Sequence, residues 1–341
     1  MADDYHHALE DCALFDLIGR GLIALSGRDA VAFLNNLCTN DVKGLPPGHS
    51  CEAFLTTAKA RVVAHLFVLR LRPDDGPVLW LDLPSGQVEK VLQHLGRYLI
   101  SEDVQLFDQT GEVSQMHLCG PGASRVLERG LSTPLPELKH LEDTPVNIEG
   151  TAPGLIRRHD YLGLPGYDIF SPRDGAERMC RLLTDCGSVM AGLETYEVLR
   201  VEGGFPLYGP DMDEDRFVVE VGRNLQAISY TKGCYLGQEP IVMARDRGHA
   251  NRTLLGLKIQ VGGPAAAGSR VLRGSEEVGQ VTSSVWSPRL GSAIALAYLR
   301  RGGQEPGTPV QIEAAGVLRS ATIAGLPFTY LTNCSDQDKN S

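Results

Sequence analysis

The feature that most constrains the fold is a change in residue pattern near position 251. Before it, apolar runs typical of strands precede stretches with apolar residues at helical spacing, as in Leu22–Leu25 followed by 30–37. After it, short apolar runs separated by glycine and proline turns continue from Leu254 to Ile312 without a helical stretch. The first pattern predicts stacked α+β units with largely antiparallel sheets, and the second predicts a small β-barrel.

The composition limits the class of protein. A chain of 341 residues predicts two or three domains, and 43% hydrophobic residues can supply their cores. The formal net charge of −10 argues against a general nucleic-acid-binding surface. None of the eight cysteines forms a Cys-x-x-Cys pair, and no apolar run suits a signal peptide or a membrane span. We therefore expect a cytoplasmic protein with reduced thiols, no membrane contact, no direct nucleic-acid binding and no tightly bound metal.

A short polar stretch from Thr231 to Glu239 groups glycines, a thiol and charged side chains. Gly233 and Gly237 allow the backbone to bend tightly around Cys234. Lys232 stands two residues before the thiol, and positive charge near a thiol favours the reactive thiolate. An isolated cysteine in such a turn is more often structural. The grouping nevertheless favours Cys234 as the reacting group, with Lys232 as its activator.

The Lys-Gly-Cys-Tyr sequence at 232–235 and the Gly-Gln-Glu sequence at 237–239 resemble the signature of the YgfZ family. Members of that family are folate-binding proteins that help to maintain iron–sulfur enzymes, and they are relatives of the glycine-cleavage T-protein, an aminomethyltransferase. Residues 26–41, 157–170 and 194–209 resemble parts of the same superfamily. The resemblance implies two intertwined α+β units with antiparallel sheets and a C-terminal β-barrel. These units would surround a central cavity that holds tetrahydrofolate or a one-carbon derivative of it.

The resemblance also implies domain boundaries. A discontinuous folate-binding α+β domain would comprise residues 1–50 and 138–248, a second α+β domain residues 51–137, and the barrel residues 249–331. Residues 131–154 carry little periodicity and are expected to connect the units. The polar residues 332–341 are expected to form a disordered tail.

The segment Arg157–Phe170 resembles the folate-contact strand of the superfamily, in which an acidic residue accepts hydrogen bonds from the pterin ring. That residue is Asp168 here, one methylene shorter than the usual glutamate. On the residues alone, Asp168 could also be an exposed residue of a hairpin, and Arg200 could be part of a structural ion pair. The resemblance places further side chains beside the folate, with the last two facing its glutamate carboxylates or a partner: Tyr167, Arg158, Arg200, Gln238, Glu239, Arg245 and Arg247.

One departure from the superfamily bears on activity. Active T-proteins carry an acidic pair in the strand that follows a glycine motif, and one of these carboxylates supports catalysis. Aligning 61–63 with that motif puts Ala64 and His65 at the acidic positions. Alanine cannot move a proton, so the departure argues against aminomethyl transfer. His65 could act as a replacement base, although a packed or partly exposed strand histidine is the more common case.

We therefore expect a tetrahydrofolate-binding protein of the YgfZ type that supports assembly or repair of iron–sulfur enzymes without aminomethyl transfer. Its partners would be folate and iron–sulfur client enzymes. Cys234 would relay a folate-linked adduct or meet an exposed cluster on a client, because one thiol cannot hold a cluster alone. The first alternative is a tetrahydrofolate-dependent aminomethyltransferase acting on a lipoyl-bound methylamine. The second is a non-catalytic scaffold with the same fold.

Overall fold

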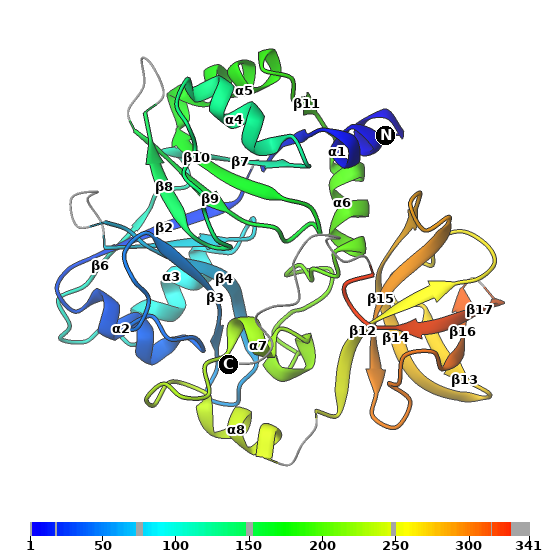
Figure 1. Cartoon of the computed structure of the whole chain (residues 1–341). Coiled ribbons are helices and arrows are strands. Elements are labelled where there is room, and N and C mark those ends of the chain that lie inside the picture. Colours follow the sequence, from blue (N-terminus) through cyan, green and yellow to red (C-terminus); the bar gives the residue numbers. More distant parts are fainter. Residues whose placement is uncertain are drawn as a thin grey trace.

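The computed structural model describes residues 2–17, 19–72, 78–147, 153–246, 250–314 and 316–328. Figure 1 shows three units. Two of them combine a β-sheet with helices, and the third is made of strands. The expected fold class, intertwined α+β units with antiparallel sheets and a C-terminal barrel, is confirmed.

The first sheet has six strands in the order β11-β1-β7-β10-β9-β8, and all its pairs are antiparallel except β1 with β11. One of its faces packs apolar side chains against α4 and α5. The elements of this unit are α1 (Ala2–Glu10), β1 (Ala13–Asp16), β7 (Val113–Cys119), α4 (Ala123–Leu131), β8 (Asp143–Val146), β9 (Gly154–Arg158), β10 (Gly166–Pro172), η1 (Arg173–Gly175), α5 (Ala176–Asp185) and β11 (Val189–Met190).

The second sheet has five antiparallel strands in the order β3-β4-β5-β2-β6. One face forms a core with α2 and α3, because alternate residues of each strand point to the same side. The elements of this unit are β2 (Gly21–Ser26), α2 (Ala30–Leu37), β3 (His49–Thr56), β4 (Val62–Arg70), β5 (Leu79–Leu83), α3 (Val88–Gly96) and β6 (Gln105–Asp108).

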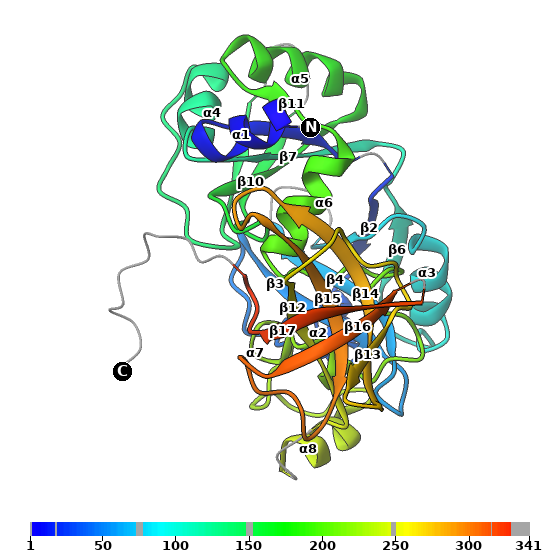
Figure 2. The same cartoon turned by 90° about the vertical axis from the view of Figure 1, so that its right-hand side faces the viewer.

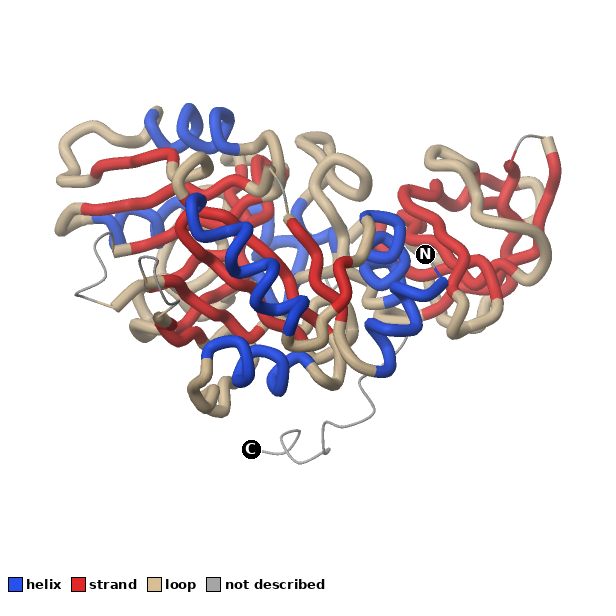
Figure 3. The backbone as a smooth tube through the Cα atoms, turned by 90° about the horizontal axis from the view of Figure 1, so that it is seen from above, coloured by secondary structure: helices blue, strands red, loops and turns tan. Residues whose placement is uncertain are grey.

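The third unit is a closed barrel in the order β12-β15-β14-β13-β16-β17, and its interior is filled by small and branched apolar side chains. Seen from above, the barrel consists of strands and loops, whereas the two sheets carry the helices (Figure 3). The strands are β12 (Arg252–Ile259), β13 (Arg270–Arg273), β14 (Glu276–Ser287), β15 (Ser292–Arg300), β16 (Pro309–Ala314) and β17 (Val317–Ala324).

The segment between the first sheet and the barrel carries the remaining helices. Helix α6 reaches from the first sheet to the barrel, where it contacts β14 and β15 (Figures 1 and 2). The chain then returns to the second sheet, where η2 and α7 lie beside β3 and β4 before α8 leads toward the barrel. Their bounds are α6 (Leu193–Glu202), η2 (Val218–Val221), α7 (Asn224–Ala227) and α8 (Gln238–Asp246).

The sheets divide the chain differently from the predicted units. Residues 21–37, expected in the folate-binding domain, join the second sheet through β2 and α2. Residues 113–131, expected in the second domain, join the first sheet through β7 and α4. The chain therefore leaves the first sheet after one strand, builds the second sheet and returns. Strand β8 lies within residues 131–154, which were expected to be a plain connection, and the predicted tail lies outside the described residues.

Candidate functional site

The cysteine loop lies at the surface, beside the C-terminal end of α2. Cys234 is exposed, whereas the other described cysteines are buried or half-buried. The thiol faces a polar surface cavity of about 730 Å³. Its lining is Asn35, Asn36, Asp41, Lys43, Lys232, Gly233, Cys234 and Tyr235. Cys234 is therefore accessible at the surface, and its role as the reacting group stays a prediction.

The ammonium group of Lys232 serves α2 and does not contact Cys234. Its Nζ donates hydrogen bonds to the carbonyl oxygens of Asn35 (2.6 Å), Cys38 (3.0 Å) and Asn40. A cation at this helix end is favourable because the last carbonyls lack partners within the helix. Burial lowers the pKa of Lys232. The described residues show no hydrogen bond between Lys232 and Cys234, and the activation of the thiol by Lys232 stays a prediction.

The residues that follow the cysteine loop form α8. Gln238 and Glu239 are its first two residues. Arg245 pairs with the adjacent Asp246 at 2.7 Å, and its guanidinium stacks on a tyrosine ring. Arg247 lies outside the described residues. Gln238, Glu239 and Arg245 therefore belong to one helix, α8.

Asp168 lies in the interior, where both carboxylate oxygens accept hydrogen bonds from neighbouring side chains. His117 Nδ1 is 2.8 Å from Oδ1, and His159 Nδ1 is 2.6 Å from Oδ2. Arg157 approaches Oδ2 with Nη2 at 2.5 Å and also donates to Asp82 on β5 at 2.7 Å. Arg157 thus links the two sheets through two carboxylates, in a fork geometry that arginine favours.

These contacts shift the pKa of the Asp168 carboxyl group. Burial alone raises the pKa of Asp168, but the neighbouring His159 and Arg157 outweigh it and hold the pKa well below its usual range. Burial lowers the pKa of His159 to about 3, so this ring is neutral at physiological pH. An ionised carboxylate can only accept, so both histidines donate to it through Nδ1. Nε2 of His117 is left without a hydrogen-bond partner in the described structure.

Strand alternation separates the residues that were expected beside Asp168. Tyr167 packs in the apolar core under α4 and α5, and its hydroxyl accepts from Arg158 Nη1 at 2.8 Å. Asp168 points to the opposite face, where its cross-strand partner is Arg157. Grouping Arg158 and Tyr167 with Asp168 at one ligand is therefore wrong, because successive strand residues face opposite sides.

Arg200 has a structural set of partners. Its fully buried guanidinium pairs with Asp211 at 2.7 Å and donates to the Phe205 carbonyl and the Ser283 hydroxyl of the barrel. It also pairs with Glu197 on the same helix. These contacts support the interpretation of Arg200 as part of a structural ion pair.

A second buried charge cluster lies on the interior face of the second sheet and was missed from the sequence. Glu52 Oε1 lies 2.7 Å from His65 Nε2, and Arg223 binds both oxygens of Glu52, with Nε at 2.8 Å and Nη2 at 2.5 Å. Burial raises the pKa of Glu52, but Arg223 and His65 outweigh it, so the pKa is lowered. Phe67, two residues after His65 on β4, shares its face and is the cross-strand partner of Glu52 on β3. Strand pairing therefore puts Glu52 on the same face as His65.

Aromatic rings line the interior between the two clusters. Phe205 lies between them, with ring centroids 5.6 Å from His65 and 4.9 Å from Tyr161. His159 lies 4.4 Å from both Tyr161 and Phe67. Three buried polar atoms near Asp168 have no hydrogen-bond partner within the described residues: His117 Nε2, Gln115 Nε2 and Arg157 Nη1. Aromatic faces and unpaired polar groups therefore lie together in the interior beside Asp168.

Comparison with known proteins identifies the family. Residues 1–228 match the model of the GCVT N-terminal domain, and residues 252–329 match that of the glycine cleavage T-protein C-terminal barrel domain. The chain belongs to the glycine-cleavage T-protein family. The two matches cover the two sheets and the barrel and leave residues 229–251, which contain the cysteine loop and α8, between them.

Similar proteins with names align with nearly the whole length of this chain. It is 31% identical to an aminomethyltransferase of Rubrobacter xylanophilus over 95% of this chain and 85% of that protein. It is 28% identical to an aminomethyltransferase of Synechococcus sp. strain CC9311, over 93% of this chain and 87% of that one. The fold matches the glycine cleavage system aminomethyltransferase T of Bartonella henselae with a TM-score of 0.87 at 24% identity, covering 96% and 90% of the chains.

These findings correct the expected function. The sequence predicted a YgfZ-type role without aminomethyl transfer, but the similar proteins are named aminomethyltransferases. The iron–sulfur client enzymes stay a prediction of the sequence. Among the described residues, no three histidine, cysteine or acidic side chains are grouped to hold a metal ion. No helix in the described part of the chain has the length and apolar character of a membrane span.

Proposed function

We propose that the chain is a tetrahydrofolate-dependent aminomethyltransferase. The observation that carries the proposal is the buried Glu52–His65 pair on the interior face of the second sheet. It supplies a carboxylate and a base where the alignment removes the acidic pair of active T-proteins. The family membership and the names of the relatives support the same reaction class.

Strand geometry explains why Ala64 does not weigh against the reaction. Ala64 faces the core formed with α2 and α3, whereas His65 faces the interior between the sheets. Only the second position of the acidic pair therefore points toward the interior site. That position carries His65, and the adjacent strand contributes Glu52 within hydrogen-bonding distance.

The pair has a defined proton arrangement. Glu52 is ionised because Arg223 and His65 lower its pKa against the effect of burial, so its oxygens can only accept. His65 must then donate to Glu52 through Nε2, so Nδ1 is the atom of this ring that can accept a proton. Glu52 thus fixes the tautomer and orientation of His65, and His65 takes a proton from the attacking folate nitrogen and passes it to the departing amine, which leaves as ammonia.

The interior next to His65 would hold the folate. Unpaired polar atoms of His117, Gln115 and Arg157 would bind the edge of the pterin, and the rings of Tyr161 and Phe205 would stack on its face. The bound folate would take the methylene carbon onto two of its nitrogens, while the carbon–sulfur bond to the lipoyl carrier breaks to leave a thiol and the amine leaves as ammonia. The packed aromatic rings exclude water from this region, which strengthens every charge interaction inside it.

The test is an assay of the full chain with tetrahydrofolate and a lipoyl carrier loaded with an aminomethyl group, in which released ammonia is measured. We expect turnover by the natural chain. We expect His65→Gln to lower kcat by roughly 10²–10⁴-fold, because it removes the proton acceptor. Glu52→Gln should lower kcat and shift the pH–rate profile, because Glu52 acts through His65, while KM for tetrahydrofolate changes little.

The matched control is His49→Gln, a partly exposed histidine on the same strand as Glu52, which should keep the activity of the natural chain. Thermal unfolding of each variant separates loss of catalysis from loss of fold. Absence of ammonia release by the natural chain at saturating substrates would refute the proposed reaction. Unchanged kcat in a folded His65→Gln variant would remove the Glu52–His65 pair from it.

We further propose that, within the family, the chain is closest in descent to the YgfZ subfamily. The support is the motif at 232–239, whose cysteine is exposed beside a polar cavity. This is a proposal about kinship and carries no separate function. It fails if an alignment of many family members groups the chain with proteins that lack the motif.

A further inference from the structure

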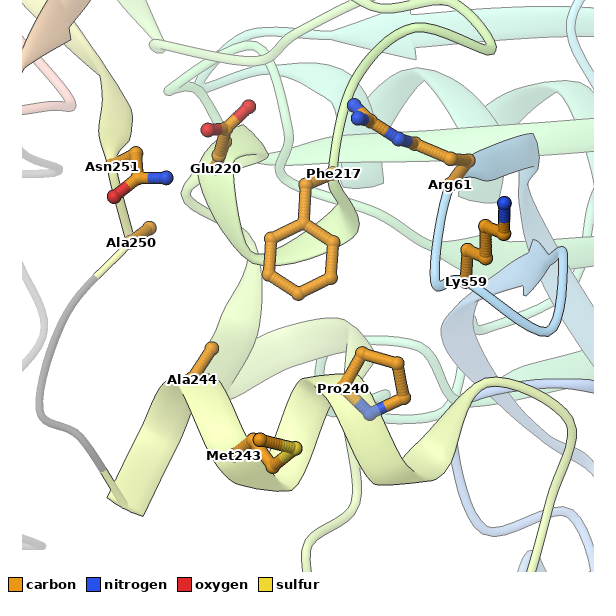
Figure 4. Close-up of a pocket in the computed structure, with 9 residues that line it drawn as sticks. All are labelled: Lys59, Arg61, Phe217, Glu220, Pro240, Met243, Ala244, Ala250 and Asn251. Carbon is orange, nitrogen blue, oxygen red and sulfur yellow. The ribbon is translucent and has the colours of Figure 1, made fainter.

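A second surface cavity lies between the second sheet and the start of the barrel (Figure 4). Its volume is about 450 Å³. The turn before β4, helix η2, helix α8 and the residues before β12 form its walls. It is lined by Lys59, Arg61, Phe217, Glu220, Pro240, Met243, Ala244, Ala250 and Asn251. None of these residues belongs to the Glu52–His65 pair or to the Asp168 network.

The cavity has two polar ends with opposite charge. Figure 4 shows Lys59 and Arg61 together at one end, and Glu220 near Asn251 at the other. Phe217 lies between them, opposite the apolar side chains of α8. A ligand that fills this space must therefore be elongated, apolar in the middle and polar at both ends.

Glu220 is the most unusual member of the lining. The residue is only 9% exposed, and its carboxylate makes no hydrogen bond or ion pair in the described structure, where only its backbone N–H donates, to the Phe217 carbonyl. The Glu220 carboxylate thus lines the cavity with its acceptor positions unused by the described residues. A cationic group that enters the cavity would supply the missing partner.

The opposite end suits an anion. Arg61 donates through Nη1 to the carbonyl of Asp215, which leaves the other edge of its planar guanidinium for a carboxylate. Helix α8 runs along the cavity with its N-terminal Pro240 toward Lys59 and Arg61 and its C-terminal part toward Glu220 (Figure 4). Its dipole therefore adds positive potential at the basic end and negative potential at the acidic end.

We propose that this cavity binds an elongated zwitterion, namely an aliphatic ω-amino carboxylate. The ammonium group pairs with Glu220, the methylene chain packs between Phe217 and Met243, and the carboxylate pairs with Arg61 and Lys59. The site is separate from the proposed transferase centre, so the two proposals stand or fall independently.

Titration calorimetry with the full chain tests the proposal with three probes of matched length: 6-aminohexanoate, hexanoate and hexylamine. We expect 6-aminohexanoate to bind with a Kd on the order of 1 mM or tighter. Each probe that lacks one charge should bind about tenfold more weakly or worse, because one end of the cavity is then unpaired. Equal affinity for all three probes, or no binding of 6-aminohexanoate at roughly ten times that concentration, would overturn the proposal.

Variants assign the two ends. Glu220→Gln should weaken binding of 6-aminohexanoate about tenfold or more and leave binding of hexanoate unchanged. Arg61→Gln should also weaken binding of 6-aminohexanoate and leave binding of hexylamine unchanged. Glu276→Gln, which removes an exposed acid on the barrel, should change neither. Thermal unfolding shows whether each variant is folded, and Glu220→Gln should not lower Tm, because it removes a buried charge without a partner. Unchanged binding of 6-aminohexanoate to folded Glu220→Gln would contradict the assignment.

Discussion

At the scale of single residues, the interior is governed by carboxylates that stay ionised because cationic and donor groups surround them. Asp168 accepts from two histidines and from Arg157, and Glu52 accepts from His65 and Arg223. Each carboxylate is buried, so removing one partner would leave an uncompensated charge. The protonation of these groups links the stability of the fold to pH.

His159 should make the fold sensitive to acid. Burial lowers its pKa to about 3 in the folded chain, while the ordinary value in the unfolded chain is about 6.5. Below pH 6.5 the unfolded chain therefore binds a proton that the folded chain does not, and the free energy of unfolding falls as pH decreases. Between pH 7.5 and 5 the loss from this group is about 2 kcal/mol.

Urea denaturation at a series of pH values measures this effect. His159→Gln should flatten the dependence between pH 7.5 and 5 by that amount, whereas His49→Gln, a half-exposed histidine, serves as the control. Identical slopes for the natural chain and His159→Gln would show that His159 does not resist protonation in the fold.

At the scale of elements, helix α2 is completed by a side chain almost two hundred residues away in sequence. Lys232 donates to three carbonyls at its C-terminal end. The helix has no basic residue in its own last turn, so this ammonium supplies the favourable charge. The cysteine loop is thereby fixed against α2, which positions Cys234 at the mouth of its cavity.

Lys232→Met should lower the free energy of unfolding by about 2 kcal/mol, because hydrogen bonds to a charged group are lost and the carbonyls are left without their donor. Chemical denaturation measures the change. Lys258→Met replaces an exposed lysine of β12 and should stay within about 0.5 kcal/mol of the natural chain. Equal effects of the two substitutions would refute the capping role.

At the scale of the whole molecule, α6 holds the barrel to the rest of the chain. Arg200 joins Asp211 and Ser283, and Glu202 accepts from Tyr5 of α1 and Ser287 of β14. Apolar residues of α6 contact the first sheet on one side and the barrel on the other. Helix α6 therefore couples the unfolding of the first sheet to that of the barrel, although the two units have separate cores.

Arg200→Met should lower the free energy of unfolding by about 3–5 kcal/mol, because it leaves buried Asp211 without its charged partner. It should also uncouple the barrel from the sheets. The chain has two tryptophans, Trp80 in the second sheet and Trp286 in the barrel, so each can be followed alone after changing the other to phenylalanine.

In the natural chain the two fluorescence transitions in urea should coincide, and in Arg200→Met they should separate. The control Arg270→Met removes an exposed ion pair of the barrel and should cost less than about 1 kcal/mol without separating the transitions. A single shared transition in Arg200→Met would show that α6 does not couple the units through this residue.

Local pattern was enough to predict most of the elements. The periodicity at 30–37 predicts a helix that the structure contains as α2, and the turn-rich region after residue 251 predicts the barrel, which is closed. The glycines around Cys234 predict a tight bend, and Gly237 adopts a positive φ of 82° there. These features depend on spacing along the chain, which the sequence displays directly.

The partners of the charged residues depended on the tertiary structure. Nothing near Lys232 in sequence indicates that it caps α2, and Arg223 meets Glu52 because the chain returns to the second sheet through η2. The order of strands also decided that Arg157, and not Arg158, shares a face with Asp168. Charge contacts across sheets are set by which faces meet, and that is a property of the assembled chain that spacing alone does not contain.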